Sequence, residues 1–181
     1  MGKLITNPQI KKALYDAEKS ECVNLITEIA DTCPQAREFL TIRFSSSDNM
    51  VNILLKYKQK VEYEFYPQRG YGRLNLREAK KAITDFKRIC SDKVLIIDLM
   101  LFYVENCVEF TKQYGDINEA FYNSALSVFS QVITAINKTD EKTYRLFAER
   151  LQSAVNNALH GWGFYDGMYD LYNEIEWCED E

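Results

Sequence analysis

Residues 94–104 read Val-Leu-Ile-Ile-Asp-Leu-Met-Leu-Phe-Tyr-Val, an apolar run of eleven residues with one charged side chain, Asp98. A helix needs about 20 apolar residues to span a bilayer, so this run is too short for a membrane segment. A helix that is apolar nearly all round has to be surrounded by other helices. We therefore expect a helix near 94–110 at the centre of a helical fold.

The segments on either side of this run have the three-to-four-residue spacing of amphipathic helices. In residues 76–90, apolar side chains fall on one side of a helix and basic side chains on the other. Seven glycines and three prolines are too few for the frequent tight turns of a sandwich or barrel. The sequence predicts an all-α fold, a compact array of seven or eight antiparallel helices. The length favours one domain over residues 1–181.

Capping residues predict where the helices begin and end. Asn75 is suited to begin one helix and Ser91 the central one, and Gly115 is suited to end the central helix. Asp116, three residues before Glu119, has the spacing of a capping box. We also expect Thr139 or Asp140 to cap a further helix, and a last helix over residues 164–177.

Composition excludes several classes of protein. The content of 46% hydrophobic and 27% charged residues is that of an ordinary globular protein rather than a disordered one. A net charge of -5 disfavours broad nucleic-acid binding, which depends on clustered lysines and arginines. The five cysteines are an odd number at wide spacing, and no secretory segment precedes them. We therefore expect reduced thiols, a cytoplasmic location and no association with a membrane.

Residues 66–73, Tyr-Pro-Gln-Arg-Gly-Tyr-Gly-Arg, interrupt the helical pattern. Glycines allow the backbone to approach a ligand closely, and arginine forks match phosphate and carboxylate groups. The spacing matches neither a Walker loop nor a dinucleotide fingerprint. Two interpretations remain open: an anion-binding corner, or a tight turn whose arginines pair with neighbouring acidic residues.

Charge is unevenly distributed along the chain. Residues 69–88 contain seven basic side chains and two acidic ones, whereas residues 166–181 contain seven acidic side chains and no basic one. Whether the acidic segment covers the basic helix is left open. The predicted ligand-binding residues are Arg69, Gly70, Tyr71, Gly72, Arg73, Lys80 and Lys81.

Carboxylates on the central helix form a second candidate. Asp98 and Glu105 are seven residues apart and share a side of the helix, with Glu109 one turn further on. A buried carboxylate requires a partner, and we expect the basic residues of the corner to supply it. A structural ion pair is favoured over a paired-carboxylate active site. The single histidine excludes a carboxylate-bridged metal bundle, so we expect no metal and no other cofactor.

A third candidate is the patch formed by His160, Trp162 and Asp166. An imidazole transfers protons well near neutral pH, so His160 is a candidate general base beside Asp166. The alternative is structural: His160 ends a helix, the glycines at 161 and 163 provide a bend, and Trp162 packs against the junction. We favour the structural interpretation and assign no catalytic residue.

Three segments in a fixed order resemble a known family, over roughly residues 50 to 175. They are Pro-Gln-Arg-Gly-Tyr-Gly at 67–72, Leu-Met-Leu-Phe-Tyr-Val at 99–104 with Phe-Tyr-Asn-Ser at 121–124, and Gly-Trp-Gly-Phe-Tyr-Asp at 161–166. Together they are similar to a bacterial domain family of unknown function. The resemblance implies an intracellular all-helical domain and no particular substrate.

These observations favour a non-enzymatic binding or scaffold module that recognises an acidic protein partner or a small anionic ligand. The alternative is a small hydrolase or transferase that acts on an anionic, phosphorylated substrate. In that alternative, Arg69 and Arg73 hold the anion, and Asp98, Glu105 or His160 moves protons. The sequence leaves the oligomeric state open.

Overall fold

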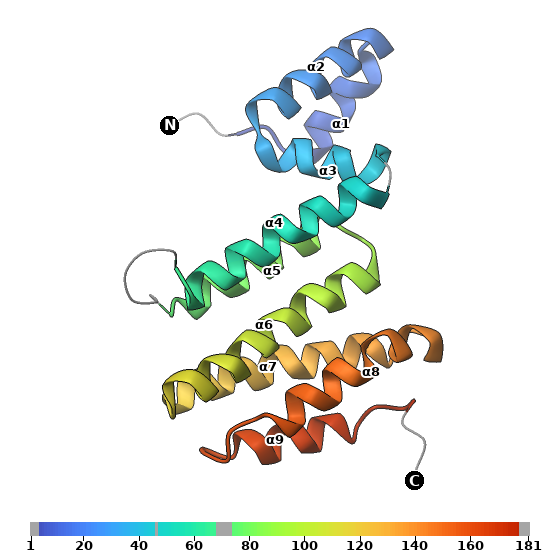
Figure 1. The fold of residues 1–181 in the computed structure, drawn as a ribbon. Coiled ribbons are helices and arrows are strands. Elements are labelled where there is room, and N and C mark those ends of the chain that lie inside the picture. The colour runs from blue at the N-terminus through green and yellow to red at the C-terminus, as the bar shows by residue number, and fades with distance from the viewer. Residues whose placement is uncertain (1–3, 46, 68–73, 178–181) are drawn as a thin grey trace. The chain divides into compact units, whose positions relative to one another are not determined.

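The computed structural model describes residues 4–45, 47–67 and 74–177. These residues form helices and no strand, which confirms the all-α class (Figure 1). The helices are α1 (Asn7–Asp16), α2 (Lys19–Thr32), α3 (Pro34–Phe44), α4 (Ser47–Phe65), α5 (Leu76–Ile89), α6 (Lys93–Tyr114), α7 (Glu119–Ile136), α8 (Glu141–Asn156) and α9 (Phe164–Tyr172). The described residues thus contain nine helices, and the expected count of seven or eight was too low. Three of these helices lie in the first 45 residues.

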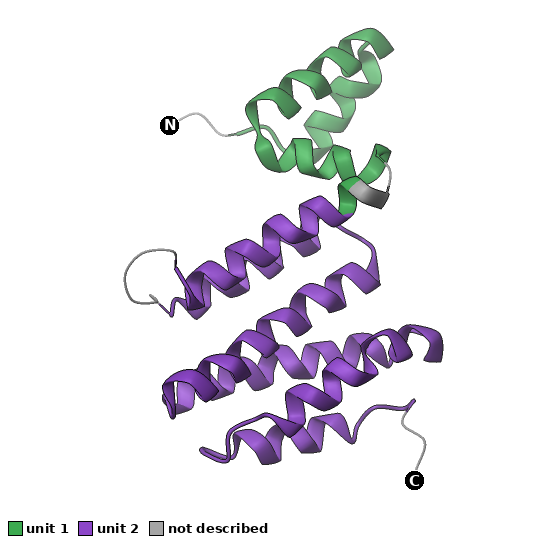
Figure 2. Ribbon diagram, in the orientation of Figure 1, with its two compact units in different colours: residues 1–50 green, residues 51–181 purple. Residues whose placement is uncertain are grey.

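The chain divides into two compact units, residues 1–50 and residues 51–181 (Figure 2). Helix α4 begins at the end of the first unit and continues through the start of the second. The single domain over residues 1–181 that the length favours stays a prediction.

Unit 1, residues 1–50, buries few of its side chains. Helices α2 and α3 contact each other, and a proline at 34 opens α3 in its first turn, where a missing amide is tolerated. Among the described residues of this unit, Ala30 and Glu38 are the buried ones. Apolar side chains such as Val23, Ile26 and Phe44 are exposed. The apolar faces of these helices are therefore largely uncovered.

Unit 2, residues 51–181, is built around α6. This helix packs against α5, α7 and α8, and half of its 22 residues are buried. Successive helices of the unit reverse direction along the chain, as Figure 1 shows. The prediction of a central apolar helix is confirmed. No helix in the described part of the chain is both long enough and apolar enough to cross a bilayer.

Aromatic rings join the helices of unit 2 across its core. Tyr57 of α4 lies 5.2 Å from Phe86 of α5, measured between ring centroids. Phe65 of α4 contacts Tyr103 of α6 edge-on at 5.8 Å. Further pairs connect α6 to α7 and α7 to α9. Much of the aromatic content of the chain is therefore used for packing between helices.

Several helix ends lie where capping residues predicted them. Asn75 and Asp140 cap α5 and α8, each with a side-chain oxygen that accepts a backbone N–H. Gly115 ends α6 with φ of +82°, a conformation that favours glycine. Two expectations were wrong: Asp92 rather than Ser91 caps α6, because its carboxylate accepts two backbone N–H groups, and α9 ends at Tyr172 rather than near 177.

Candidate functional site

A surface hollow of about 480 Å³ lies between α5 and α7, and we call it the cationic groove. Its α5 side carries four basic side chains, and its α7 side carries two small residues. These residues are Arg77, Lys80, Lys81, Arg88, Ala120 and Ser124. The groove lies within unit 2 and on the basic helix face that the sequence predicts.

The amphipathic pattern of α5 places the basic side chains in the groove. Ala79, Ile83 and Phe86 are buried on one side of α5, which packs against α6. The basic residues on the opposite side are thereby left toward solvent. Two of these cations have acidic neighbours on the same helix: Lys81 lies 3.7 Å from Glu78, and Arg88 lies 3.3 Å from Asp85. Exposed pairs of this kind are worth about 1 kcal/mol or less, so a ligand can compete with them.

Lys87 links the two helices instead of facing a ligand. Its Nζ donates to Oε1 of Gln131 on α7 at 3.0 Å. Partial desolvation lowers the pKa of Lys87, although its side chain is exposed. We therefore assign Lys87 to the packing of α5 and α7.

The structure describes two of the seven predicted ligand-binding residues. Lys80 and Lys81 both line the cationic groove. Arg69, Gly70, Tyr71, Gly72 and Arg73 lie outside the described residues, so their role stays a prediction. Ala120 and Ser124 were missed, although Ser124 ends the segment at 121–124 that carries the resemblance. Their position opposite α5 follows from the packing of α7, which local spacing does not reveal.

The described part of the acidic C-terminal segment contacts the end of α7. The Asn137 side chain donates to the Glu174 carbonyl at 2.7 Å, and the Trp177 indole donates to the Ile136 carbonyl at 3.3 Å. These contacts are made at the C-terminal end of α7, whereas Ala120 and Ser124 lie in its first two turns. Residues 173–177 therefore occupy a position apart from the α7 side of the groove.

The carboxylates of α6 take part in an ion network with α4 and α8. The Arg150 guanidinium donates to both carboxylate oxygens of Glu105, at 2.7 and 2.8 Å, and to Oδ1 of Asp98 at 2.6 Å. Lys58 donates to Asp98 at 2.8 and 2.9 Å. The side chains are partly buried, with 19% of Asp98 and 34% of Arg150 exposed. Asp98 is thus paired, and its partners among the described residues come from α4 and α8. Arg69 and Arg73 of the corner lie outside the described residues, so their pairing with Asp98 stays a prediction.

The network keeps Arg150 charged. Burial acts to lower the pKa of the Arg150 guanidinium, but the hydrogen bonds and charges of Glu105 and Asp98 outweigh it and raise that pKa. Both carboxylates accept hydrogen bonds from a permanent cation, which is the geometry of a structural bridge between helices. This arrangement supports the structural ion pair that the sequence favours.

One protein family matches the chain. Residues 5–175 match DUF6155, a family of unknown function. The chain belongs to this family. No curated protein and no solved structure matches it. The expected membership of a family without assigned function is confirmed, and DUF6155 supplies no substrate or partner to transfer.

In this DUF6155 chain, Trp162 of the third candidate patch hydrogen-bonds with Asp116, the residue that the sequence predicts to be a helix cap. The Trp162 indole donates to Oδ2 of Asp116 at 2.9 Å, and the Tyr122 hydroxyl donates to Oδ1 at 2.6 Å. The hydrogen bond from Tyr122 lowers the pKa of Asp116 most, and the hydrogen bond from Trp162 lowers it further. The capping-box prediction for Asp116 is wrong, because Asn118 caps α7. Asp116 instead joins the α6–α7 connection to the turn before α9.

The remaining members of this patch lie on the same turn and on α9. The His160 ring lies against the Tyr165 ring in a tilted arrangement with centroids 4.2 Å apart, and Asp166 is in the first turn of α9. Trp162 and Gly163 have φ of +51° and +67°, so both take part in the bend that the glycines predict. No three His, Cys, Asp or Glu side chains gather as metal ligands within the described ranges. Trp162 joins two turns through its hydrogen bond to Asp116, but its side chain is 60% exposed and so is not packed into the junction as expected. Helix α8 ends at Asn156, so the expectation that His160 ends a helix was wrong.

Proposed function

We propose that this chain is a non-enzymatic binding module that recognises an acidic protein partner or a small anionic ligand through the cationic groove. One observation carries the proposal: four basic side chains line a single hollow on a chain whose net charge is -5. A local positive surface on an acidic protein attracts anions selectively. The same net charge disfavours nucleic acid as the partner.

The proposal retains Arg69 and Arg73 as ligand-binding residues because they immediately precede α5 in the sequence. It also places the protein in the cytoplasm of a bacterium. Cys22, Cys33, Cys90 and Cys107 are free, and free thiols are typical of a reducing compartment. The bacterial origin rests on the resemblance alone.

The enzymatic alternative, a small hydrolase or transferase, has less support. Catalysis on an anion held in the groove needs a proton-transferring group beside it. Asp98 and Glu105 accept hydrogen bonds from Arg150, and the His160 ring lies against the Tyr165 ring of α9. These contacts favour packing roles for all three residues, and so favour the binding module.

The test removes three groove cations together: Arg77→Ala, Lys80→Ala and Lys81→Ala. A control chain carries Lys11→Ala, Lys12→Ala and Lys19→Ala, which removes the same charge from exposed residues of unit 1. Binding of pyrophosphate and of a polyglutamate peptide is measured by titration calorimetry at low and at moderate salt. We expect the groove variant to lose about tenfold or more in affinity and the control to lose less than about threefold.

Equal losses in the two variants would overturn the proposal, because binding would then follow net charge and not the groove. Failure of the unmodified protein to bind either probe at low salt would overturn it as well. The relative affinity of the two probes distinguishes a small ligand from a protein partner.

A further inference from the structure

The α7 side of the cationic groove includes a serine, Ser124. Ala120 and Ser124 are four residues apart on α7 and therefore lie one above the other on the same face. Small side chains at these two positions leave room between α7 and the long basic side chains of α5. Ser124 retains 8% of its surface exposed while it lines the groove. Ser124 is thus a largely buried residue at the edge of the groove, and its hydroxyl makes a buried hydrogen bond.

Behind Ser124, a hydrogen bond joins its hydroxyl to the core of unit 2. Ser124 Oγ lies 2.9 Å from the hydroxyl of Tyr103, a residue of α6 with no exposed surface. Two hydroxyls that can each donate and accept therefore connect the core to the groove.

Each of these two hydroxyls has a single proton, so the pair has two arrangements. In one, Ser124 donates to Tyr103. In the other, Tyr103 donates to Ser124, and the Ser124 proton is left for a ligand in the groove. A ligand that only accepts hydrogen bonds selects the second arrangement, in which both hydroxyl protons have an acceptor.

The charges around this hydroxyl favour an acceptor that is also an anion. Arg77, Lys80, Lys81 and Arg88 line the groove against one acidic side chain, Asp85, which pairs with Arg88. The groove volume of about 480 Å³ is within the range of small-molecule sites.

Building on the proposed function of the groove, we propose that its ligand carries a phosphoryl group, one oxygen of which accepts a hydrogen bond from the Ser124 hydroxyl that Tyr103 orients. Basic side chains of α5 neutralise the remaining oxygens. A phosphoryl group has only acceptor oxygens and up to two negative charges, so it matches both the outward proton and the surrounding cations. A carboxylate side chain of a protein partner has one charge and a less compact set of acceptors.

The test compares Ser124→Ala with Ser127→Ala, a control on the same helix at an exposed position. Titration calorimetry with inorganic phosphate, phosphoserine and a polyglutamate peptide measures affinity, and thermal unfolding confirms that each variant is folded. We expect Ser124→Ala to bind the two phosphoryl probes about tenfold more weakly, the loss of one hydrogen bond to a charged group. Ser127→Ala should bind them as the unmodified protein does.

Tyr103→Phe provides a second and independent test. It keeps the Ser124 hydroxyl but removes the group that orients it, so we expect phosphate affinity to fall about two- to fivefold. Phosphate affinity that is unchanged in Ser124→Ala overturns this inference. If the three α5 substitutions still abolish binding in that case, the proposed function stands without it. Binding of polyglutamate but not phosphate also overturns the inference alone, and binding of no anion overturns both.

Discussion

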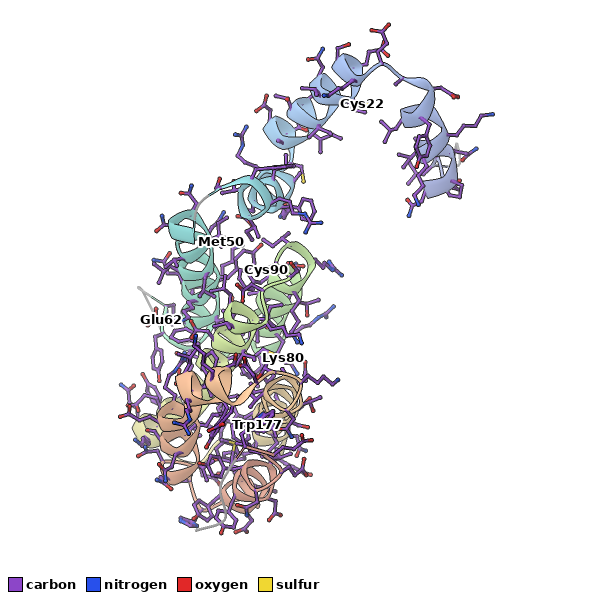
Figure 3. All side chains as sticks on the ribbon, turned by 90° about the vertical axis from the view of Figure 1, so that its right-hand side faces the viewer. Cys22, Met50, Glu62, Lys80, Cys90 and Trp177 are labelled. Carbon is purple, nitrogen blue, oxygen red and sulfur yellow. The ribbon has the colours of Figure 1, made fainter. Side chains whose placement is uncertain are left out.

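The two compact units differ in where their apolar side chains lie. In residues 1–50, α1 buries no residue, and α2 and α3 bury one residue each. In residues 51–181, α6 buries half of its length and α7 buries Phe129, Val132 and Ile133 on its inner face. Figure 3 shows side chains filling the spaces between the helices of unit 2, while many on α1 and α2 stand clear of the ribbon.

This difference teaches that an amphipathic pattern predicts a helix more reliably than it predicts a covered face. The apolar residues of α2, such as Val23 and Ile26, have helical spacing, yet they are exposed. Burial of apolar surface is the main favourable term in folding. Unit 2 should therefore supply most of the free energy of unfolding, and substitutions in the two units should differ accordingly.

The largest expected effect compares Phe129→Ala with Phe39→Ala. Phe129 has no exposed surface, so its truncation removes buried apolar contacts and leaves a cavity, at a cost of about 3–5 kcal/mol. Phe39 in unit 1 is 38% exposed, and we expect its truncation to cost about 1 kcal/mol or less. Urea unfolding followed by circular dichroism measures both. Equal losses would mean that the first 50 residues contribute to a shared cooperative core.

Much of unit 2 can be predicted from local sequence because local physics determines it. The run at 94–104 predicts the central helix, and Asn75 predicts the start of α5, since both depend on residues within one or two turns. The basic face of α5 follows from the same periodicity. The sequence therefore predicts the α5 side of the cationic groove.

The missed contacts of the candidate site depend on residues far apart in the sequence. Asp116 has the spacing of a helix cap, but its actual partner Trp162 is 46 residues away. Arg150 reaches Glu105 and Asp98 across 45 and 52 residues. Ser124 forms the other side of the groove because α7 packs next to α6. Local patterns do not specify which helices become neighbours, so they do not predict these contacts.

An intermediate effect is expected for Arg150→Met, compared with Arg37→Met in unit 1. Without Arg150, the Glu105 carboxylate loses the donor of two hydrogen bonds, and Asp98 keeps those from Lys58. Fully buried pairs cost about 3–5 kcal/mol to break, and the partial exposure of this network reduces our expectation to about 1–3 kcal/mol. Arg37 pairs with Asp31, but both side chains are more than 60% exposed, so its loss should cost about 1 kcal/mol or less.

Urea unfolding at two salt concentrations measures the Arg150 effect, because salt screens the exposed pair more than the network. Adding Asp98→Asn to Arg150→Met completes a double-mutant cycle. A coupling energy near zero between these two positions would contradict the network. A loss for Arg37→Met as large as that for Arg150→Met would contradict the difference between the units.

The smallest effect is expected at Asp116 of unit 2. This residue is exposed, as the Arg37–Asp31 pair of unit 1 is. The hydrogen bonds from Tyr122 and Trp162 lower the pKa of Asp116, so the folded state favours the ionised carboxylate. Its contribution to stability is complete above the unfolded pKa of about 3.9 and is lost as the pH falls through the lower, folded value. Because the carboxylate is at the surface, this loss should alter the local contact and leave the core of unit 2 folded.

The two tryptophans make this prediction measurable within one molecule. The Trp162 indole donates to a carboxylate that titrates, whereas the Trp177 indole donates to the backbone carbonyl of Ile136, which does not. In NMR spectra recorded from pH 6 to pH 2.5, the Trp162 indole N–H peak should move with a midpoint below about 3.9. The Trp177 peak should lack this midpoint, and Asp116→Asn should remove it from Trp162. Simultaneous movement of both indole peaks would instead indicate acid unfolding of unit 2, and the exposed contact would then have the stability of the core around it.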